Sequence, residues 1–346
     1  PLNVFQYLSF RGAYAALTTL LICFILGPHI IEALRQLKIG QAVRADGPQT
    51  HLKKGGTPTM GGVFIICSVV VSMLLWQDFH NDKVWIAMGA FVALGGIGFM
   101  DDFLKVTKHN SDGLSAGAKL VGQFVVALVV MLYLYVTGGE GATALYIPFF
   151  KKPVVDLGIL WIPFGILLIM GESNAVNFSD GLDGLAAGLL LFVFAGLAII
   201  AYISGRADYS AYLDIPYIVG GGEFMVLCLA VVGACIGFLW FNAHPADVFM
   251  GDVGSLPLGG LIAIISLIIK KEILMLILGG VFVLEITSVM IQVASFKLRN
   301  KKRVFKMAPI HHHFEMSGWA ETKVVVRFWI LGGLFAIIAL STLKIQ

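Results

Sequence analysis

The amino-acid sequence predicts an all-α integral membrane protein with about ten transmembrane helices. Of its 346 residues, 58% are hydrophobic and only 13% are charged, and the mean hydropathy is +0.89. A soluble domain has about 25% charged residues. Apolar stretches of roughly the 20 residues that a spanning helix needs recur along the whole chain. Helices satisfy their own backbone hydrogen bonds in lipid, whereas a β-barrel would show shorter segments of alternating polarity.

Each predicted span is an apolar stretch bounded by polar residues. In order, the spans lie near 12–33, 59–77, 84–100, 117–137, 157–172, 185–203, 224–242, 255–270, 273–296 and 324–343. No small-residue cleavage site follows the first stretch, so we interpret it as a span and not as a signal peptide. No linker or low-complexity tract divides the chain, which predicts one membrane domain over residues 1–346.

The distribution of Lys and Arg predicts how these helices are oriented. The first, third and ninth loops hold fifteen of these residues, whereas the even-numbered loops hold six. Cytoplasmic loops carry the excess of positive charge, so the odd-numbered loops face the cytoplasm and both termini face the other side. The net charge of +3 is too small to indicate nucleic-acid binding.

Five polar segments, far apart in the sequence, would therefore meet on the cytoplasmic face. They are DGPQTHLKKGGTPTMGG (46–62), GFMDDFLK (98–105), NAVNFSDGLDGLAAG (174–188), WFNAHPADVFMGDVGS (240–255) and APIHHHFE (308–315). The even-numbered loops contain nothing comparable, which predicts a functional site on one membrane face only.

Asp101 and Asp102 directly follow an apolar stretch. Ionisable residues at membrane depth are costly and are functional candidates. Adjacent residues on a helix point about 100° apart, so one carboxylate could face a site while the other meets a different partner. The alternative is that the pair marks the water boundary or caps the next segment. We interpret the pair as functional because other acidic loops would lie beside it.

A second group consists of Asn174 and Asn177, followed by Asp180 and Asp183 at the same spacing of three. Residues three apart on a helix share a face, and the glycines next to the aspartates allow a ligand to approach the backbone. The alternative is an N-terminal cap for the span near 185, where Asp is favoured. Capping would explain one aspartate, but not two asparagines and two aspartates together.

Asp252 lies next to a glycine immediately before a span, with Asn242 and Phe249 close to it in sequence. A carboxylate there can hold Mg²⁺, which completes its shell with phosphates and water, although capping is again the alternative. Clustered carboxylates repel one another and repel an anionic substrate, and a divalent cation removes both problems. The charges therefore predict Mg²⁺ as the cofactor without fixing its ligands.

His311, His312 and His313 lie in a basic loop. They are internal, so we do not interpret them as an engineered tag. They could bind a pyrophosphate or position a leaving group, whereas consecutive histidines without Cys do not suit Zn²⁺. Lys54, followed by two glycines, suits phosphate but lacks the P-loop spacing, and a role at the membrane surface is the alternative for it.

The strings TPTMGG, GFMDDF, NAVNFSDGLDGLA, FLWFN, FMGDVGS and APIHHHFE occur in this order. The ordered set resembles the bacterial phospho-N-acetylmuramoyl-pentapeptide transferases, of the polyprenyl-phosphate N-acetylhexosamine-1-phosphate transferase superfamily. The resemblance implies Mg²⁺-dependent transfer of phospho-MurNAc-pentapeptide from UDP-MurNAc-pentapeptide to undecaprenyl phosphate, giving lipid I and UMP for peptidoglycan synthesis. It also implies a homodimer in the bacterial inner membrane, with a cytoplasmic active site and a ninth helix bent to admit lipid. In that membrane, the distribution of Lys and Arg predicts that both termini are periplasmic.

Residue roles follow from the same resemblance. It implies that Asp252 is the Mg²⁺ ligand, that Asp101 and Asp102 are essential, and that Asp101 deprotonates or orients the lipid phosphate. His311 is assigned to catalysis with these three. The residues assigned to substrate binding are Lys54, Asn174, Asn177, Asp180, Asp183, Asn242, Phe249, Gln292, His312 and His313. We favour direct attack by the lipid phosphate over a two-step route through a phospho-enzyme.

Other functional classes fit the sequence less well. A transferase for N-acetylglucosamine nucleotides is the nearest alternative, but the three histidines favour the first branch. A transporter would show repeated halves with broken helices, and none is evident. The pattern of CDP-alcohol phosphotransferases fails because no Arg follows Leu185, Ala186 and Ala187. A structural scaffold would not need five polar segments on one face.

Overall fold

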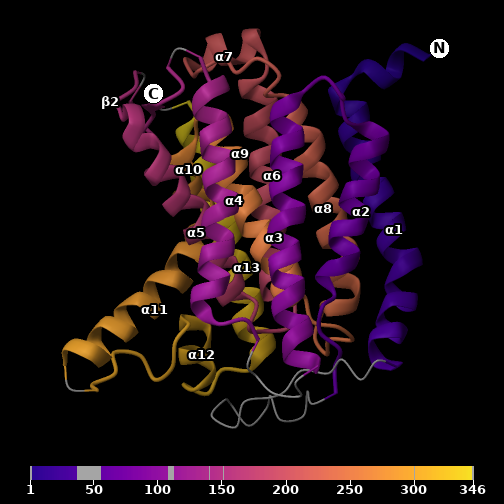
Figure 1. Ribbon diagram of the computed structural model, residues 1–346, viewed down its shortest axis with the longest axis vertical. Helices are drawn as coiled ribbons and strands as arrows, with labels where there is room; N and C mark the ends of the chain where they lie inside the picture. The colour runs from indigo at the N-terminus through magenta and orange to yellow at the C-terminus, as the bar shows by residue number, and fades with distance from the viewer. Residues whose placement is uncertain are drawn as a thin grey trace.

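The computed structural model is a bundle of long helices (Figure 1) and describes residues 2–36, 56–107, 113–139, 141–150, 152–299 and 301–344. The predicted all-α membrane class is confirmed. The elements are η1 (Leu2–Gln6), α1 (Leu8–Gln36), α2 (Gly62–Trp76), α3 (Asp82–Thr107), α4 (Ala116–Thr137), β1 (Ala144–Leu145), β2 (Val155–Asp156), η3 (Gly158–Leu160), α5 (Trp161–Ser179), α6 (Leu185–Ser204), α7 (Ala207–Leu213), α8 (Glu223–Asn242), α9 (Asp252–Ile268), α10 (Glu272–Leu278), α11 (Gly280–Leu298), α12 (Ile310–Glu315) and α13 (Glu321–Thr342).

The ten predicted spans all correspond to helices. Within the described ranges, eight helical segments are long and apolar enough to cross a membrane, and α2 and α9 are shorter apolar helices. The ninth predicted span is divided at Gly279 into α10 and α11. Glycine is a poor helix former, and beyond this break α11 diverges from the bundle (Figure 1).

Two helices continue several residues past their predicted ends, because α3 ends at Thr107 instead of near 100 and α5 at Ser179 instead of near 172. Lys105 and Lys119 were counted with the third loop, but Lys105 lies in the last turn of α3 and Lys119 in the first turn of α4. Helix α3 continues past its apolar stretch because its polar end packs at the site described below, and α4 begins within one residue of its predicted start. The two lysines are therefore held by helices rather than by a loop.

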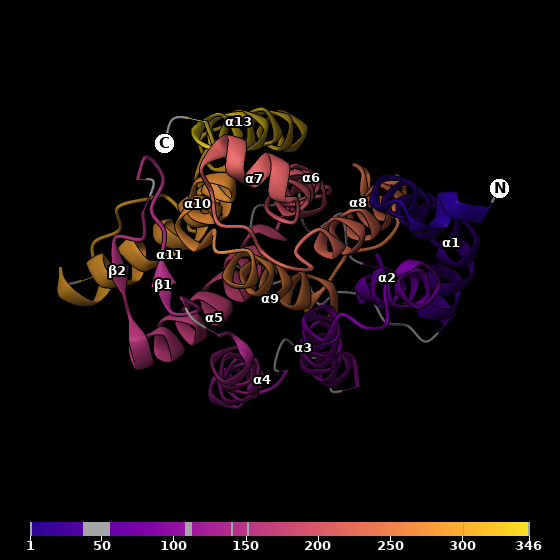
Figure 2. The same cartoon turned by 90° about the horizontal axis from the view of Figure 1, so that it is seen from above.

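Helix α9 forms the centre of the bundle, between α3 and α5 (Figure 2). All of its residues from Asp252 to Ile268 are buried. A helix that is apolar on every side is stable only when other helices surround it. Because α9 begins with Asp252, the burial of this helix carries a carboxylate into the interior at one end of the bundle.

Helices α3 and α9 approach each other closely at that end. A Cβ atom added to Gly98 would lie 2.2 Å from the carbonyl oxygen of Asp252, so only glycine fits there. Asp102 lies one helical turn after Gly98. The close crossing therefore places the two aspartates of α3 next to the first residue of α9.

The polar elements separate between the two ends of the bundle. We call the end that carries α12 and the carboxyl end of α3 the site end. The opposite end, which we call the far end, carries both chain termini, α7 and the β1–β2 hairpin (Figure 1). The predicted sidedness in the membrane and the single-domain organisation stay predictions.

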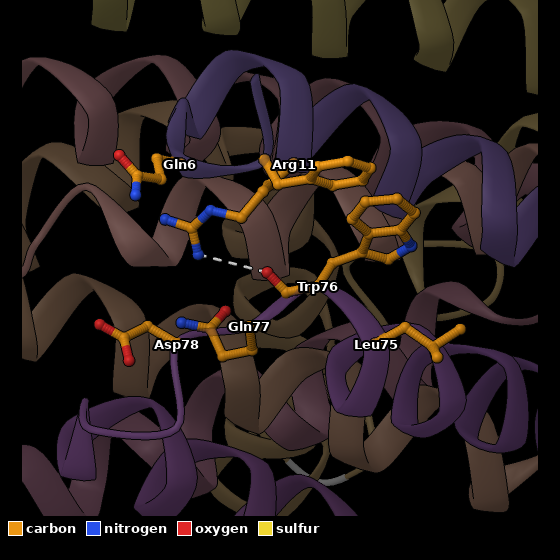
Figure 3. Close-up of a pocket in the computed structure, with 7 residues that line it drawn as sticks. Gln6, Arg11, Leu75, Trp76, Gln77 and Asp78 are labelled. Atoms are coloured by element: carbon orange, nitrogen blue, oxygen red, sulfur yellow. Dashed lines mark hydrogen bonds between the residues drawn. The ribbon is translucent and has the colours of Figure 1, made fainter. Parts of the chain in front are cut away.

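The far end contains a pocket of about 550 Å³ between η1, α1 and the end of α2 (Figure 3). Arg11 donates hydrogen bonds to the carbonyl oxygen of Trp76 at 3.2 Å and to both carboxylate oxygens of Glu223 on α8. Gln77 donates to the same carboxylate at 2.8 Å. This network ties three helices together.

Candidate active site

Three buried carboxylates converge at the site end. One oxygen of each of Asp101, Asp102 and Asp252 lies within 4.8 Å of the others. The two neighbours on α3 also have different backbone partners, as their 100° offset predicts. Asp101 accepts a hydrogen bond from the amide of Leu114 at 2.8 Å, and Asp102 accepts one from the amide of Val253 at 3.1 Å.

Two lysines lie between these carboxylates. The Nζ atom of Lys105 is 2.6 Å from Asp101, 3.2 Å from Asp102 and 3.6 Å from Asp252. The Nζ atom of Lys119 is 3.0 Å from Asp101 and also contacts Asp252. Within the described residues, three carboxylates thus face two ammonium groups, so the carboxylates outnumber the cations. Sequence reasoning missed both lysines, although the spacing of Lys105 at three and four residues from the aspartates could have indicated the first.

Helix capping does not account for the aspartates. Asp101 and Asp102 lie inside α3, which continues to Thr107. The N-caps of α9 and α6 are Gly251 and Gly184, and neither end has a side-chain capping hydrogen bond. The carboxylates are therefore held in place by tertiary contacts.

The loop after α5 joins this cluster. Ser255 donates a hydrogen bond to the side-chain oxygen of Asn177 at 3.1 Å, and Asp180 accepts one from the amide of Gly251 at 3.2 Å. Burial raises the pKa of Asp180 to about 7, and the carboxylates of Asp252 and Asp102 act in the same direction. A bound cation would lower this pKa again.

Gly251 makes that approach possible. Its φ of 74° is in the left-handed region, and a Cβ atom there would lie 2.5 Å from Asp102 Oδ2. Glycine alone adopts this conformation at no steric cost. The backbone before α9 can therefore touch carboxylates from α3 and from the loop after α5 at once.

Asp183 belongs to a separate cluster. Its carboxylate is 3.0 Å from His244 Nδ1 and accepts a hydrogen bond from the amide of Ala246 at 3.2 Å. Its own amide donates to Glu321 at 3.0 Å. One ligand atom from each of Asp183, His244 and Glu321 lies within 4.8 Å of the others. The predicted pair of Asp180 and Asp183 thus divides between two neighbouring groups.

Three amides that the sequence assigned to substrate contact protein groups in the structure. Asn174 donates to Gln123 at 2.9 Å. Asn242 accepts from the amide of Gly184 at 3.0 Å and donates to the carbonyl of Val248 at 2.8 Å. Gln292 binds the backbone of Val304 and Phe305, all at 3.0 Å. Asn242 and Gln292 therefore hold site loops in place, and their predicted contacts with substrate stay predictions.

Phe249 links two of the polar segments. Its amide donates to the carbonyl of Pro58 and its carbonyl accepts from the amide of Gly61, both at 2.8 Å. The TPTMGG and FMGDVGS segments are thereby paired through their backbones. Lys54, which was assigned to the phosphates, lies outside the described residues.

The three histidines all lie on α12, but they contact different parts of the protein. A Cβ atom added to Gly181 would lie 2.5 Å from His311 Nε2 and 3.4 Å from His312 Nε2. His313 instead accepts a hydrogen bond from the amide of Lys306 at 3.1 Å. Two imidazoles therefore meet the loop that carries Asp180, and the third supports the segment before α12.

The carboxylate cluster fits Mg²⁺ by its chemistry. Three convergent oxygens and no Cys or His suit a hard cation, whereas a Zn²⁺ site would use nitrogen or sulfur ligands. In the described part of the chain, the three carboxylates outnumber Lys105 and Lys119, and this excess of negative charge favours a cation at this position. Asp101, Asp102 and Asp252 are the residues that could hold it.

Known proteins resemble the chain over its full length. Residues 84–270 match the family model described as glycosyl transferase family 4. The phospho-N-acetylmuramoyl-pentapeptide-transferase of Thermodesulfovibrio yellowstonii is 50% identical over 346 residues, which are 100% of this chain and 96% of the relative. Proteins of the same name from Syntrophus aciditrophicus and Rickettsia akari are each 51% identical over 344 and 345 residues, covering 99% of this chain and 96% of each relative.

Proposed function

The chain belongs to the phospho-N-acetylmuramoyl-pentapeptide-transferase family, and from this premise we propose that it transfers phospho-MurNAc-pentapeptide from UDP-MurNAc-pentapeptide to undecaprenyl phosphate. The products are lipid I, used in peptidoglycan synthesis, and UMP. The observation that carries the proposal is the group of three buried carboxylates within 4.8 Å of one another at one end of a membrane bundle. A charge-rich site at the end of apolar helices suits one polar and one lipid substrate.

The proposed cofactor is Mg²⁺, held by Asp252 with Asp101 and Asp102. When bound, it would neutralise the diphosphate and stabilise the charge that develops during phosphoryl transfer. Lys105 and Lys119 share the same carboxylates and orient them. Their ammonium groups also add positive charge where an anionic substrate would meet an acidic site.

The proposed chemistry is direct attack. An oxygen of the lipid phosphate bonds to the β-phosphorus of the nucleotide, and the bond from that phosphorus to the oxygen of UMP breaks. Asp101 orients the lipid phosphate or accepts its proton. His311 and His312 present Nε2 atoms at Gly181, which suits contact with the diphosphate, while Asn177, Asp180, Asp183 and Phe249 form the nucleotide side.

The proposed setting is the bacterial inner membrane, where the protein acts as a homodimer with its site end in the cytoplasm. The excess of Lys and Arg in the odd-numbered loops supports this orientation. Both termini lie at the far end (Figure 1), so the same orientation places them in the periplasm.

The test is release of UMP from UDP-MurNAc-pentapeptide by detergent-solubilised protein with undecaprenyl phosphate, with and without Mg²⁺. We expect Mg²⁺-dependent release that Asp252→Ala abolishes and Asp208→Ala retains, because Asp208 is an exposed far-end residue paired with Arg206. No release by folded wild-type protein would contradict the proposal, and UDP-N-acetylglucosamine would be the next substrate to try. Radiolabelled phosphosugar trapped on the protein without lipid acceptor would replace direct attack by a phospho-enzyme route.

A further inference from the structure

Glu285 is a buried carboxylate to which the proposed reaction assigns no role. It lies on α11 with 0% of its surface exposed. A charged side chain inside a membrane protein is costly unless it is paired. No Lys or Arg of the described ranges forms an ion pair with it. The basic group beside it is His311, whose Nδ1 is 3.1 Å from Glu285 Oε2.

His311 is also fully buried, and its two nitrogens face different elements. Nδ1 faces Glu285 on α11, whereas Nε2 faces Gly181 in the loop after α5. Among the described residues, neither ring nitrogen of His311 makes a hydrogen bond, and neither carboxylate oxygen of Glu285 makes one. The pair is therefore held at ion-pair distance, and Nε2 of His311 is a buried polar atom that meets the site loop without a hydrogen-bond partner in the described ranges.

The neighbouring histidine repeats this arrangement. His312 Nδ1 is 2.7 Å from Glu315 Oε2, and its Nε2 faces the same glycine. Each imidazole thus has a carboxylate at Nδ1 and turns Nε2 to Gly181. For His312 the carboxylate comes from the same short helix, whereas for His311 it comes from α11.

We propose that Glu285 is a positioning residue that fixes His311 with Nδ1 toward α11 and Nε2 toward the diphosphate of the bound nucleotide. This inference rests on the proposed function. A carboxylate beside one imidazole nitrogen favours the proton on that nitrogen and fixes the ring orientation. Nε2 then faces the loop as an acceptor or, when the ring carries two protons, as a donor to a phosphate oxygen.

A purely structural role for Glu285 predicts different behaviour. If Glu285 only anchored α12, its replacement would lower stability and activity whether or not His311 were present. If Glu285 acts through His311, the two replacements remove the same contribution to kcat. The double variant is then about as active as the less active of the two single variants.

The experiment measures kcat for UMP release and the thermal midpoint for Glu285→Gln, Glu285→Asp, His311→Asn and the double variant Glu285→Gln/His311→Asn. Glu272→Gln is the matched control, because Glu272 is also fully buried and neither of its oxygens hydrogen-bonds to another described residue, but it lies at the far end on α10, 3.8 Å from Lys270 Nζ. We expect Glu285→Gln to lower kcat about 10- to 100-fold, Glu285→Asp to lower it less, and Glu272→Gln to keep it.

The double variant decides the inference. A kcat within about threefold of the less active single variant supports positioning through His311. Two outcomes would overturn the inference and leave the proposed function intact. One is a loss of kcat in the double variant equal to the product of the two single losses, and the other is full activity of Glu285→Gln when wild-type protein is active. If Glu285→Gln is unfolded, Glu285→Asp combined with His311→Asn gives the same comparison. Wild-type protein that releases no UMP would overturn the proposed function and this inference together.

Discussion

The two ends of the bundle both bury charged side chains, but they balance the charge differently. At the far end, Arg11 meets Glu223 through two hydrogen bonds of 2.8 and 2.5 Å, so one cation faces one anion. At the site end, the cations that the described part of the chain places beside Asp101, Asp102 and Asp252 are Lys105 and Lys119. A balanced pair is complete in itself, whereas an excess of buried carboxylates is costly until a further cation joins them.

This difference in charge balance predicts which charges are structural and which are functional without any reference to sequence motifs. The far-end pair joins α1 to α8, and Gln77 extends the network to the end of α2. The site-end cluster instead joins α3, α4 and α9 with an uncompensated charge at their meeting point. Changes at the far end should therefore alter stability, and changes at the site end should alter activity.

The largest expected effect is the loss of activity at the site end. We expect Asp101→Asn and Asp102→Asn each to lower kcat for UMP release by about 10²- to 10⁴-fold, because each removes a charge from the proposed cation and phosphate site. Glu223→Gln makes the same kind of change at the far end and should keep kcat within about threefold per folded molecule. Equal losses at both ends would show that the charge imbalance does not mark the site.

A smaller effect is expected on stability at the far end. Arg11→Met leaves Glu223 without its cation and should lower the free energy of unfolding by about 3 kcal/mol. The double variant Arg11→Met/Glu223→Leu removes both charges and should recover most of that loss. Thermal midpoints in detergent, read beside UMP release, measure both quantities. A double variant as unstable as the single one would mean that the ion pair stabilises the bundle by more than the cost of burying its two charges.

The sequence predicted the membrane class and the positions of ten apolar helical segments, eight of which are long enough to cross a membrane, because hydropathy depends only on local composition. It also identified the aspartates of the site, since charges next to apolar stretches stand out. It could not show that Lys119 meets Asp252, because that contact depends on how α4 packs against α3 and α9. Nor could it show that Asn242 and Gln292 bind backbone groups, because an amide has the same local pattern in either role.

The site-end charge should also make the stability depend on Mg²⁺. A ligand that binds only the folded state stabilises it by about 2.7 kcal/mol at 100 times its Kd. We expect Mg²⁺ to raise the thermal midpoint of wild-type protein and of Arg11→Met/Glu223→Leu alike, and a chelator to reverse the shift. Asp252→Asn should lose the shift because it removes one of the three carboxylates. An equal shift in Asp252→Asn would place the cation elsewhere.

The smallest expected effect concerns Lys271, a buried far-end lysine between α9 and α10. Burial lowers its pKa from 10.5 to about 8. Between about pH 8 and 10.5 the unfolded chain therefore binds more protons than the folded chain, so stability rises with pH through this window. Below it, both states are protonated and the cost of burying the charge is fully present.

Lys271→Met should remove that cost. We expect the variant to be more stable than wild-type protein by about 1 to 3 kcal/mol at pH 7, with the difference shrinking as the pH approaches 10. Lys152→Met, at an exposed position, should show no such trend in the thermal midpoint. A constant difference between Lys271→Met and wild-type protein across this range would mean that Lys271 stays charged when buried. In that case the nearby Glu272, whose Oε1 lies 3.8 Å from Lys270 Nζ, compensates two buried lysines at once, unlike the one-to-one pair of Arg11 and Glu223.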